Sequence, residues 1–308
     1  MKILVTGANG DIGEAVGRIL QETFPSAEIF GADASGQWPG GFVFKSMLHA
    51  PFASAPEYID HLHRLRGRFD LIIPTSEPEL ARLSQVKDIK GQLPLLMVDP
   101  GILSIFMDKY ETFLFLDKHG FNPPRTKLFT EVETADLPVY VKPRRGAGGR
   151  GHRLIDTDVE MQAAKEVTAD GWVAQEYLPG GDNEYTCALF RFNGSVKYVV
   201  LRRQLEGGKT VKAEVVDLPE IGILLEDIAE IINLDGCINV QLKMTGDGPR
   251  VFEINPRLSS TVMMRHRLGF RDCEWWARSF LGMPLGVSSA PAVGTVVYRM
   301  STECVVPK

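Results

Sequence analysis

The stretch that most constrains this fold runs from Asn239 to Arg257, where two alternating apolar segments flank the turn residues Thr245 to Gly248. Alternation of apolar and polar residues on both sides of a glycine-containing turn predicts a β-hairpin. Glu253 and Asn255 are two residues apart on the second strand, so both side chains point to the same face. A carboxylate and an amide oxygen together suit Mg²⁺, which binds hard oxygens and commonly keeps substrate phosphates as its other ligands.

The register of this hairpin decides whether Gln241, on the first strand, adds a third oxygen. Directly opposed residues of an antiparallel pair share a face. A two-residue turn at Gly246 and Asp247, continued without a shift, sends Gln241 to the face of Phe252 and away from Glu253. We therefore predict either a loop with an odd number of residues or a β-bulge that shifts the register by one residue.

The order Gln241, Glu253, Asn255, Arg257 resembles the metal-binding hairpin of ATP-grasp enzymes, especially the branch that is similar to carbamoyl-phosphate synthetase. The resemblance implies that the first three residues bind Mg²⁺, with Mn²⁺ as a substitute. It also implies a catalytic role for Arg257, whose fork of donors lies where a metal-bound phosphate would be. The alternative for so short a pattern is an ordinary hairpin with a polar outer face.

Composition limits the class of protein. The chain has 308 residues, which is typical of two or three domains, and a net charge of −5, which does not indicate nucleic-acid binding. Its apolar runs are shorter than a membrane span. The four cysteines are scattered without a C-x-x-C pair. We expect a cytoplasmic protein with reduced thiols and small-molecule substrates, binding neither nucleic acid nor membrane.

The first hundred residues read as a doubly wound α/β unit. Lys2 to Thr6 is a short apolar strand, the glycine-rich stretch Gly7 to Gly13 turns the chain into a helical pattern, and a second strand ends at Asp33. Further strands are predicted at Asp70 to Thr75 and at Leu93 to Val98. The glycines and the acid alone favour an NAD(P)-binding oxidoreductase.

The ATP-grasp resemblance gives this unit a different role, because such enzymes begin with a Rossmann-like domain that generally binds no dinucleotide. We expect that domain at residues 1–105. Glu77 and Glu79 begin a helix predicted to reach Ile89 and lie where α/β sheets place ligands. The alternative is that these acids simply favour a helix N-terminus.

The middle of the chain carries candidate phosphate ligands. Asp108 is a plausible helix N-cap, and the phrase around Lys109 resembles the entry to the ATP-grasp domain, where a lysine reaches the nucleotide phosphates. A strand ending near Lys142 leads into the basic, glycine-rich segment from Arg144 to Gly151. Backbone N–H groups in such segments cradle anions. By resemblance, Lys142 contacts the α- and β-phosphates, the flap includes Gly148 and Gly149, and Arg144 and Arg145 assist the phosphates or the substrate.

The remaining candidate residues are expected to bind the nucleoside of ATP and the reacting groups. The segment Gln175, Glu176, Tyr177, Leu178 resembles the hinge whose backbone groups read adenine in ATP-grasp enzymes. Glu184 resembles the acid that accepts from the ribose hydroxyls. Arg203 resembles a basic catalytic position near the γ-phosphate, with a salt bridge at the rim of the site as the alternative.

Together these motifs predict a Rossmann-like parallel sheet domain followed by an α+β ATP-grasp domain at residues 106–308, with a lid at about 125–177. The resemblance implies an ATP- and Mg²⁺-dependent ligase that joins a carboxylate to an amine. Two alternatives stay open, namely an NAD(P)-binding oxidoreductase and a catalytically silent ATP-binding protein. The sequence names neither substrate, and it leaves the oligomeric state open although dimers are common among such enzymes.

Overall fold

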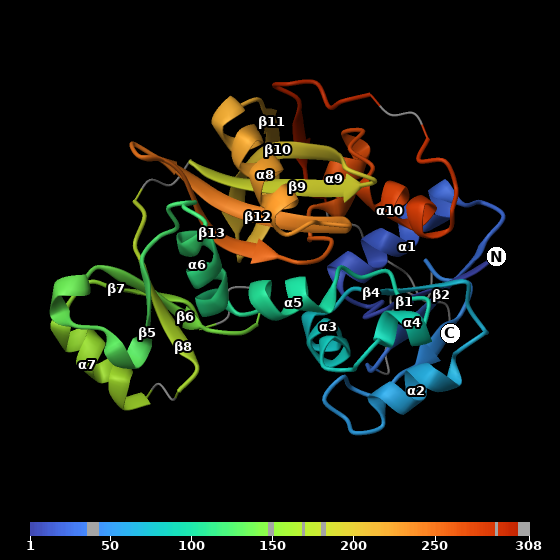
Figure 1. Cartoon of the computed structure of the whole chain (residues 1–308), viewed down its shortest axis with the longest axis horizontal. Helices are drawn as coiled ribbons and strands as arrows, with labels where there is room; N and C mark the ends of the chain where they lie inside the picture. Colours follow the sequence, from blue (N-terminus) through green and yellow to red (C-terminus); the bar gives the residue numbers. More distant parts are fainter. Residues whose placement is uncertain (36–42, 147–150, 168–169, 180–182, 287–288, 301–308) are drawn as a thin grey trace.

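The computed structural model describes residues 1–35, 43–146, 151–167, 170–179, 183–286 and 289–300. Within these residues the strands form three sheets, one parallel and two antiparallel (Figure 1). The predicted fold class is therefore confirmed, with a parallel α/β unit first and a two-sheet α+β part after it. No helix in the described ranges combines the length and apolar character that a membrane crossing requires.

The parallel sheet has the strand order β3-β2-β1-β4. Its strands are β1 (Lys2–Thr6), β2 (Glu28–Asp33), β3 (Met47–His49) and β4 (Leu71–Pro74), and its helices are α1 (Asp11–Thr23), α2 (Tyr58–Arg64), α3 (Glu77–Ser84), α4 (Ile89–Gln92) and α5 (Pro100–Phe106). All strand pairs in this sheet are parallel, as the strand–turn–helix pattern of the sequence predicts.

Two expectations for this unit are wrong. The segment from Leu93 to Val98 is not a strand and makes only an isolated bridge between Leu95 and Ile72. Pro94 has no N–H with which to extend a ladder, which explains the short pairing. The predicted helix from Glu77 to Ile89 ends at Ser84, and Asp88 adopts a left-handed conformation with φ of 54° before α4 begins.

The largest sheet has the order β13-β12-β9-β10-β11-β14. Its strands are β9 (Glu184–Phe192), β10 (Ser195–Glu206), β11 (Lys209–Val216), β12 (Gly236–Thr245), β13 (Gly248–Asn255) and β14 (Val296–Tyr298), with helices α8 (Pro219–Ile231), α9 (Val262–Arg267) and α10 (Asp272–Phe280). Every pair in it is antiparallel, so the hairpin β12–β13 forms one edge of a continuous surface.

The small antiparallel sheet has the order β5-β8-β6-β7 and lies within the predicted lid. Its elements are β5 (Thr126–Leu128), β6 (Val139–Pro143), β7 (Arg153–Ile155), β8 (Trp172–Glu176), α7 (Asp158–Val167) and the 3₁₀ turns η2 (Phe129–Glu131) and η3 (Thr134–Asp136), and helix α6 (Lys109–Lys118) precedes them. This sheet packs a separate core, made by Phe129, Val132, Val139, Val141, Ile155, Met161, Ala164 and Ala174.

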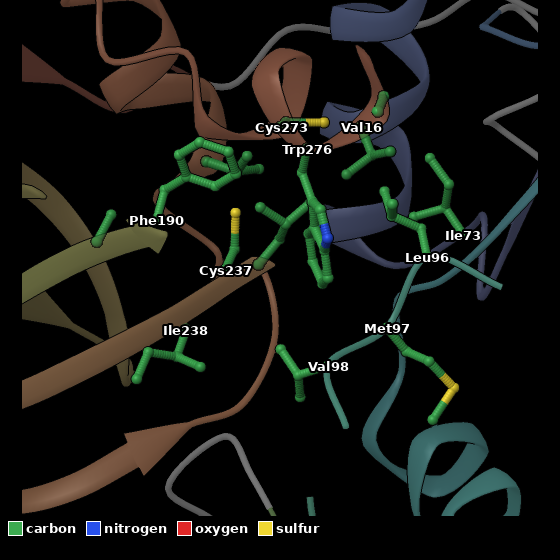
Figure 2. Close-up of a cluster of buried hydrophobic side chains, with 14 of the residues drawn as sticks. Val16, Ile73, Leu96, Met97, Val98, Phe190, Cys237, Ile238, Cys273 and Trp276 are labelled. Carbon is green, nitrogen blue, oxygen red and sulfur yellow. The ribbon is translucent and has the colours of Figure 1, made fainter. Parts of the chain in front are cut away.

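By contrast, the parallel sheet and the largest sheet share one buried core. Figure 2 shows Trp276 of α10 between Val16 and Ile73 of the parallel unit and Cys237 of β12. Because one core spans both units, we expect them to move together, while the small sheet moves separately. The predicted boundary near residue 105 remains a prediction.

The register of the central hairpin confirms the expected bulge. Thr245 lies opposite Gly248 across a two-residue turn, yet Gln241 lies opposite Glu253, because the register shifts between Gln241 and Leu242. Phe252 is the extra residue on β13. The shift brings Gln241 to the same face as Glu253, which a regular two-residue hairpin would not do.

The packing around Trp276 generates a stability prediction for Gly236. Its φ is 115°, and an added Cβ would lie 2.5 Å from the indole of Trp276. We expect Gly236→Ala to reduce the free energy of unfolding by on the order of 3 kcal/mol, measured by urea denaturation, since strain and overpacking add. Gly246→Ala, at a position with nothing within 4 Å of the new atom, is the control. Equal unfolding midpoints for the two variants would show that the indole is not packed against this glycine.

Candidate active site

The candidate site residues come together between the small sheet and the hairpin β12–β13. In Figure 1 the small sheet and the six-stranded sheet lie on either side of α6. Lys142 comes from β6, Lys109 from the first turn of α6, and Glu253 from β13. These elements belong to different parts of the chain, so the site exists only when the two antiparallel sheets face each other.

Lys142 projects from the lid toward the hairpin. Its neighbours Val139 and Val141 face the core of the small sheet, so alternation puts Lys142 on the opposite face. Its Nζ donates to Gln175 Oε1 at 2.8 Å and to the carbonyl of Phe252 at 3.4 Å. The bulge carbonyl therefore faces the lid lysine. Burial lowers the pKa of Lys142 to about 8, although the charge of Glu253 opposes this shift.

Lys109 approaches the same region from α6. Its Nζ donates to the carbonyl of Gly146 at 2.6 Å, and its side chain is buried. Burial acts to raise the pKa of Glu253, but the charges of Lys109 and Lys142, the Asn255 amide and Arg203 together hold it below its ordinary value. Three cations thus surround one carboxylate, and the site has a local excess of positive charge suited to phosphates.

The predicted metal ligands share one face of the hairpin. Gln241 lies opposite Glu253, and Asn255 Nδ2 donates to Glu253 Oε1 at 3.1 Å. Within the described residues, no group of three or more His, Cys, Asp or Glu side chains gathers as a metal site. A set with one carboxylate and two amide oxygens suits Mg²⁺ when phosphates supply the remaining negative charge.

Both amide oxygens accept hydrogen bonds from arginines. Gln241 Oε1 accepts from Arg203 at 2.8 Å, and Asn255 Oδ1 accepts from Arg257 at 3.4 Å. The oxygens fit Mg²⁺ in kind and in placement. Each amide oxygen has two lone pairs, so it could bind a cation with the one that its arginine does not use.

Arg203 pairs with the predicted ribose acid. Its Nε donates to Glu184 Oε1 at 3.0 Å, while the same guanidinium bonds Gln241. The two side chains are only 10 % and 17 % exposed, so the pair lies inside the site rather than at its rim. One arginine therefore connects the predicted ribose position with the predicted metal position.

Arg257 connects the hairpin to the parallel sheet unit. Its guanidinium donates to Glu77 Oε1 at 2.8 Å, at the start of α3. Glu79 has a different role, since it is buried and accepts from the hydroxyls of Tyr58 and Ser76, both at 2.7 Å. Of the two acids, only Glu77 contacts a predicted site residue, and Glu79 completes the helix capping box.

The predicted hinge contacts both antiparallel sheets. Gln175 Nε2 donates to Thr126 Oγ1 at 3.1 Å within the lid, whereas the Leu178 carbonyl accepts from Lys243 of the hairpin at 2.9 Å. The Glu176 N–H donates to Arg125 O at 2.8 Å and is already engaged. Tyr177, which stands between Glu176 and Leu178 in the sequence, is partly exposed. Gln175 to Leu178 therefore join the two sheets at the edge of the site.

Several residues have roles that the sequence did not indicate. Arg144 and Arg145, expected near phosphates or substrate, both donate to the buried Asp108. His152 packs edge-on against Tyr140 at 5.7 Å, and its pKa falls to about 4 through burial and then through the charges of Lys142 and Lys109. Its position directly after the glycine-rich segment was the available signal. Gly148 and Gly149 lie outside the described residues, and their flap role stays a prediction.

The glycine-rich turn of the parallel sheet is used for packing. Asp33, the acid on which the oxidoreductase interpretation depends, accepts from the backbone N–H groups of Asn9 and Ser35, both at 2.9 Å. A side chain at Gly13 would collide with the carbonyl of Gly7, and one at Gly7 would press on Thr75. These glycines therefore allow α1 to lie close to β1.

Comparisons with known proteins identify the fold. A family model described as an ATP-grasp in the biosynthetic pathway with the Ter operon matches residues 168–303. N5-carboxyaminoimidazole ribonucleotide synthetase from Thermus thermophilus superposes with a TM-score of 0.75 at 19% identity, covering 94% of this chain and 81% of that one. The chain therefore has an ATP-grasp-like fold.

Two further solved structures share this fold. The Staphylococcus aureus N5-carboxyaminoimidazole synthetase complexed with ADP has a TM-score of 0.75 at 17% identity, covering 92% of this chain and 78% of that one. An L-amino acid ligase from Bacillus licheniformis has a TM-score of 0.72 at 16% identity, with 91% and 74% covered.

Among curated proteins, uncharacterized protein MG011 of Mycoplasma genitalium is 29% identical over 134 residues, which is 42% of this chain and 46% of that protein. The chain thus matches less than half the length of this curated relative.

The junction at the hinge generates a second stability prediction. Arg250 is buried and donates to Asn122 O at 2.8 Å, to Pro123 O at 3.1 Å and to Glu176 at 2.9 Å. We expect Arg250→Met to lower the free energy of unfolding by on the order of 3 kcal/mol, because it leaves these acceptors without their donor.

The matched control is Arg125→Met. Arg125 lies 3.7 Å from the same Glu176 carboxylate, but its side chain is 83% exposed. We expect a change of within about 0.5 kcal/mol in urea denaturation. A large loss in the Arg125 variant, or none in the Arg250 variant, would contradict the assigned roles.

Proposed function

We propose that this ATP-grasp protein is an ATP- and Mg²⁺-dependent ligase that activates a carboxylate as an acylphosphate and transfers the acyl group to an amine. The observation that carries this proposal is the meeting of Lys109 and Lys142 with the oxygen face of Gln241, Glu253 and Asn255. Structural neighbours named as synthetases and a ligase, two of them in complex with ADP, support the same class of enzyme.

In this proposal the nucleotide lies between β6 and the hairpin. Adenine contacts the hinge at Gln175 to Leu178, where the Glu176 carbonyl and the Leu178 amide read its edge. Glu184 accepts from the ribose hydroxyls, since a carboxylate has acceptor positions enough for a vicinal diol. Lys142 and Lys109 hold the phosphates, and Lys142 leaves the Phe252 carbonyl to do so.

Gln241, Glu253 and Asn255 would hold Mg²⁺, which when bound neutralises and orients the phosphates. Arg203 lies close enough to Gln241 to stabilise charge on the transferring phosphoryl group. Arg257, which now donates to Glu77, would hold the acceptor carboxylate by exchanging one carboxylate partner for another.

The proposed chemistry has two steps. A carboxylate oxygen of the substrate attacks the γ-phosphorus, the bond to the bridging oxygen breaks, and ADP leaves. The amine nitrogen then attacks the acyl carbon, inorganic phosphate leaves with the electron pair of the broken C–O bond, and the amine loses a proton. Neither step needs a nucleophile from the protein. Cys187 supplies none, because burial raises the pKa of its thiol far above neutrality.

The test is phosphate release from ATP and Mg²⁺ against a panel of carboxylates, each with and without amines. We expect release that requires a carboxylate and Mg²⁺, and a product with a new amide bond when an amine is present. Lys142→Ala should lower turnover by on the order of 100-fold while the protein remains folded, because an electrostatic stabiliser is lost. Binding of NAD(P) together with failure to bind ATP–Mg²⁺ would reject the proposal.

The pKa of Lys142 predicts how nucleotide binding depends on pH. In the free protein this pKa is about 8, whereas nucleotide phosphates favour the ammonium form and raise the pKa in the complex. Below pH 8 the lysine already carries its proton, but above pH 8 binding must take one up. We therefore expect the affinity for ADP, measured by calorimetry, to fall by up to about fivefold between pH 8 and pH 9.

The control for this pH dependence is Lys142→Arg, because a guanidinium stays charged throughout the range. The ADP phosphates are already ionised above neutrality and contribute little to the slope. We expect the arginine variant to bind with an affinity that changes little from pH 8 to pH 9. The same decline in both proteins would assign the titration to another group.

A further inference from the structure

The root of the glycine-rich segment, residues 144–146, is fastened to the first turn of α6. The N–H of Lys109 donates to the Arg144 carbonyl at 2.9 Å, and Lys109 Nζ donates to the Gly146 carbonyl at 2.6 Å. The Arg144 N–H donates in turn to Gly171 O at 2.8 Å, within the lid. The backbone at Arg144 is therefore held between α6 on one side and the small sheet on the other.

The side chains add an ion pair to these bonds. Asp108, whose side chain is 1% exposed, accepts from Arg144 Nε at 2.7 and 2.8 Å through its two oxygens. Asp108 is also the N-cap of α6, accepting from the N–H groups of Tyr110 and Glu111. One buried carboxylate thus caps the helix and anchors the loop, and leaving it without the arginine would leave its charge largely uncompensated.

Arg144 is held along its whole length. Its NH2 group donates to Glu111 Oε1 at 3.0 Å, and its guanidinium lies 5.4 Å from the centre of the Tyr110 ring. Its neighbour Arg145 differs, because that side chain is 74% exposed and, within the part of the chain that the structure describes, contacts Asp108 through Nε at 3.2 Å. The two adjacent arginines therefore carry the same charge but differ in burial, since the Arg144 side chain is only 29% exposed.

The ion pair joins the neighbours of the two proposed phosphate lysines. Asp108 directly precedes Lys109, and Arg144 follows Lys142 by two residues. We propose that Asp108 and Arg144 are positioning residues, which fix the start of the glycine-rich segment against α6 so that Lys109 and Lys142 reach the same phosphates. This inference rests on the proposed nucleotide site.

The proposal predicts a loss that depends on the phosphates of the ligand. Adenosine would use the hinge and Glu184 alone, whereas ADP also uses the two lysines. Arg144→Gln should therefore weaken the binding of ADP with Mg²⁺ by at least tenfold, measured by calorimetry, and change adenosine binding by less than about twofold. A purely structural role in folding would weaken both ligands alike.

Arg145→Gln is the matched control, since it removes the same charge one residue away. We expect less than a twofold change for either ligand. An equal loss of ADP affinity in the two arginine variants would assign the effect to overall charge or to direct phosphate contact, and would overturn the inference.

Asp108→Asn tests the other half of the pair without removing the helix cap, because Asn is as good an N-cap as Asp. We expect this variant to weaken ADP binding by a similar factor, and the double variant with Arg144→Gln to be no weaker than either single variant. Unchanged or tighter ADP binding in Asp108→Asn would mean that a freed Arg144 contacts phosphate itself, which would overturn positioning.

Binding measurements on the wild-type protein separate failure of the proposed function from failure of this inference alone. If it binds neither ADP nor a non-hydrolysable ATP analogue, the proposed function fails and this inference fails with it. If the wild-type protein binds ADP and the two arginine variants lose equal affinity, only the inference fails.

Discussion

The one-residue register shift at Phe252 is the constraint on which this site depends. Without it, a two-residue turn at Gly246 and Asp247 would put Gln241 and Glu253 on opposite faces of the hairpin. With it, the two side chains lie opposite each other, and the bulge carbonyl of Phe252 faces Lys142 of the lid. A local irregularity in one strand therefore assembles the oxygen face and also provides one contact between the two antiparallel sheets.

The electrostatics follow from this assembly. Glu253 keeps its negative charge in a partly buried position because Lys109, Lys142 and Arg203 surround it, and the same cations prepare the site for phosphates. The parallel sheet and the six-stranded sheet share a core, while the small sheet has its own, so moving the small sheet away would separate charges rather than break a hydrophobic core. In the proposed function, a bound nucleotide would supply the negative charge that holds the small sheet against the hairpin.

The sequence predicted those features that depend on spacing. Alternation along β13 placed Glu253 and Asn255 on one face, and parity required either an odd loop or a bulge if Gln241 was to share that face. Side-chain pairs distant in sequence could not be predicted in this way, because nothing local relates Arg203 to Gln241 or Arg144 to Asp108. The failed strand at Leu93 to Val98 shows the other limit, since an apolar run containing a proline supports only a single bridge.

The central claim is that ATP binds between the lid and the hairpin and not at the glycine-rich turn of the parallel sheet. Photolabelling with 8-azido-ATP and Mg²⁺, followed by peptide mapping, tests it most directly, because the reactive group lies on the adenine. We expect the label on peptides from the hinge at Trp172 to Leu178 or from β13, with protection by excess ADP. A protectable label on the peptide containing Gly7 to Gly13 would contradict the account.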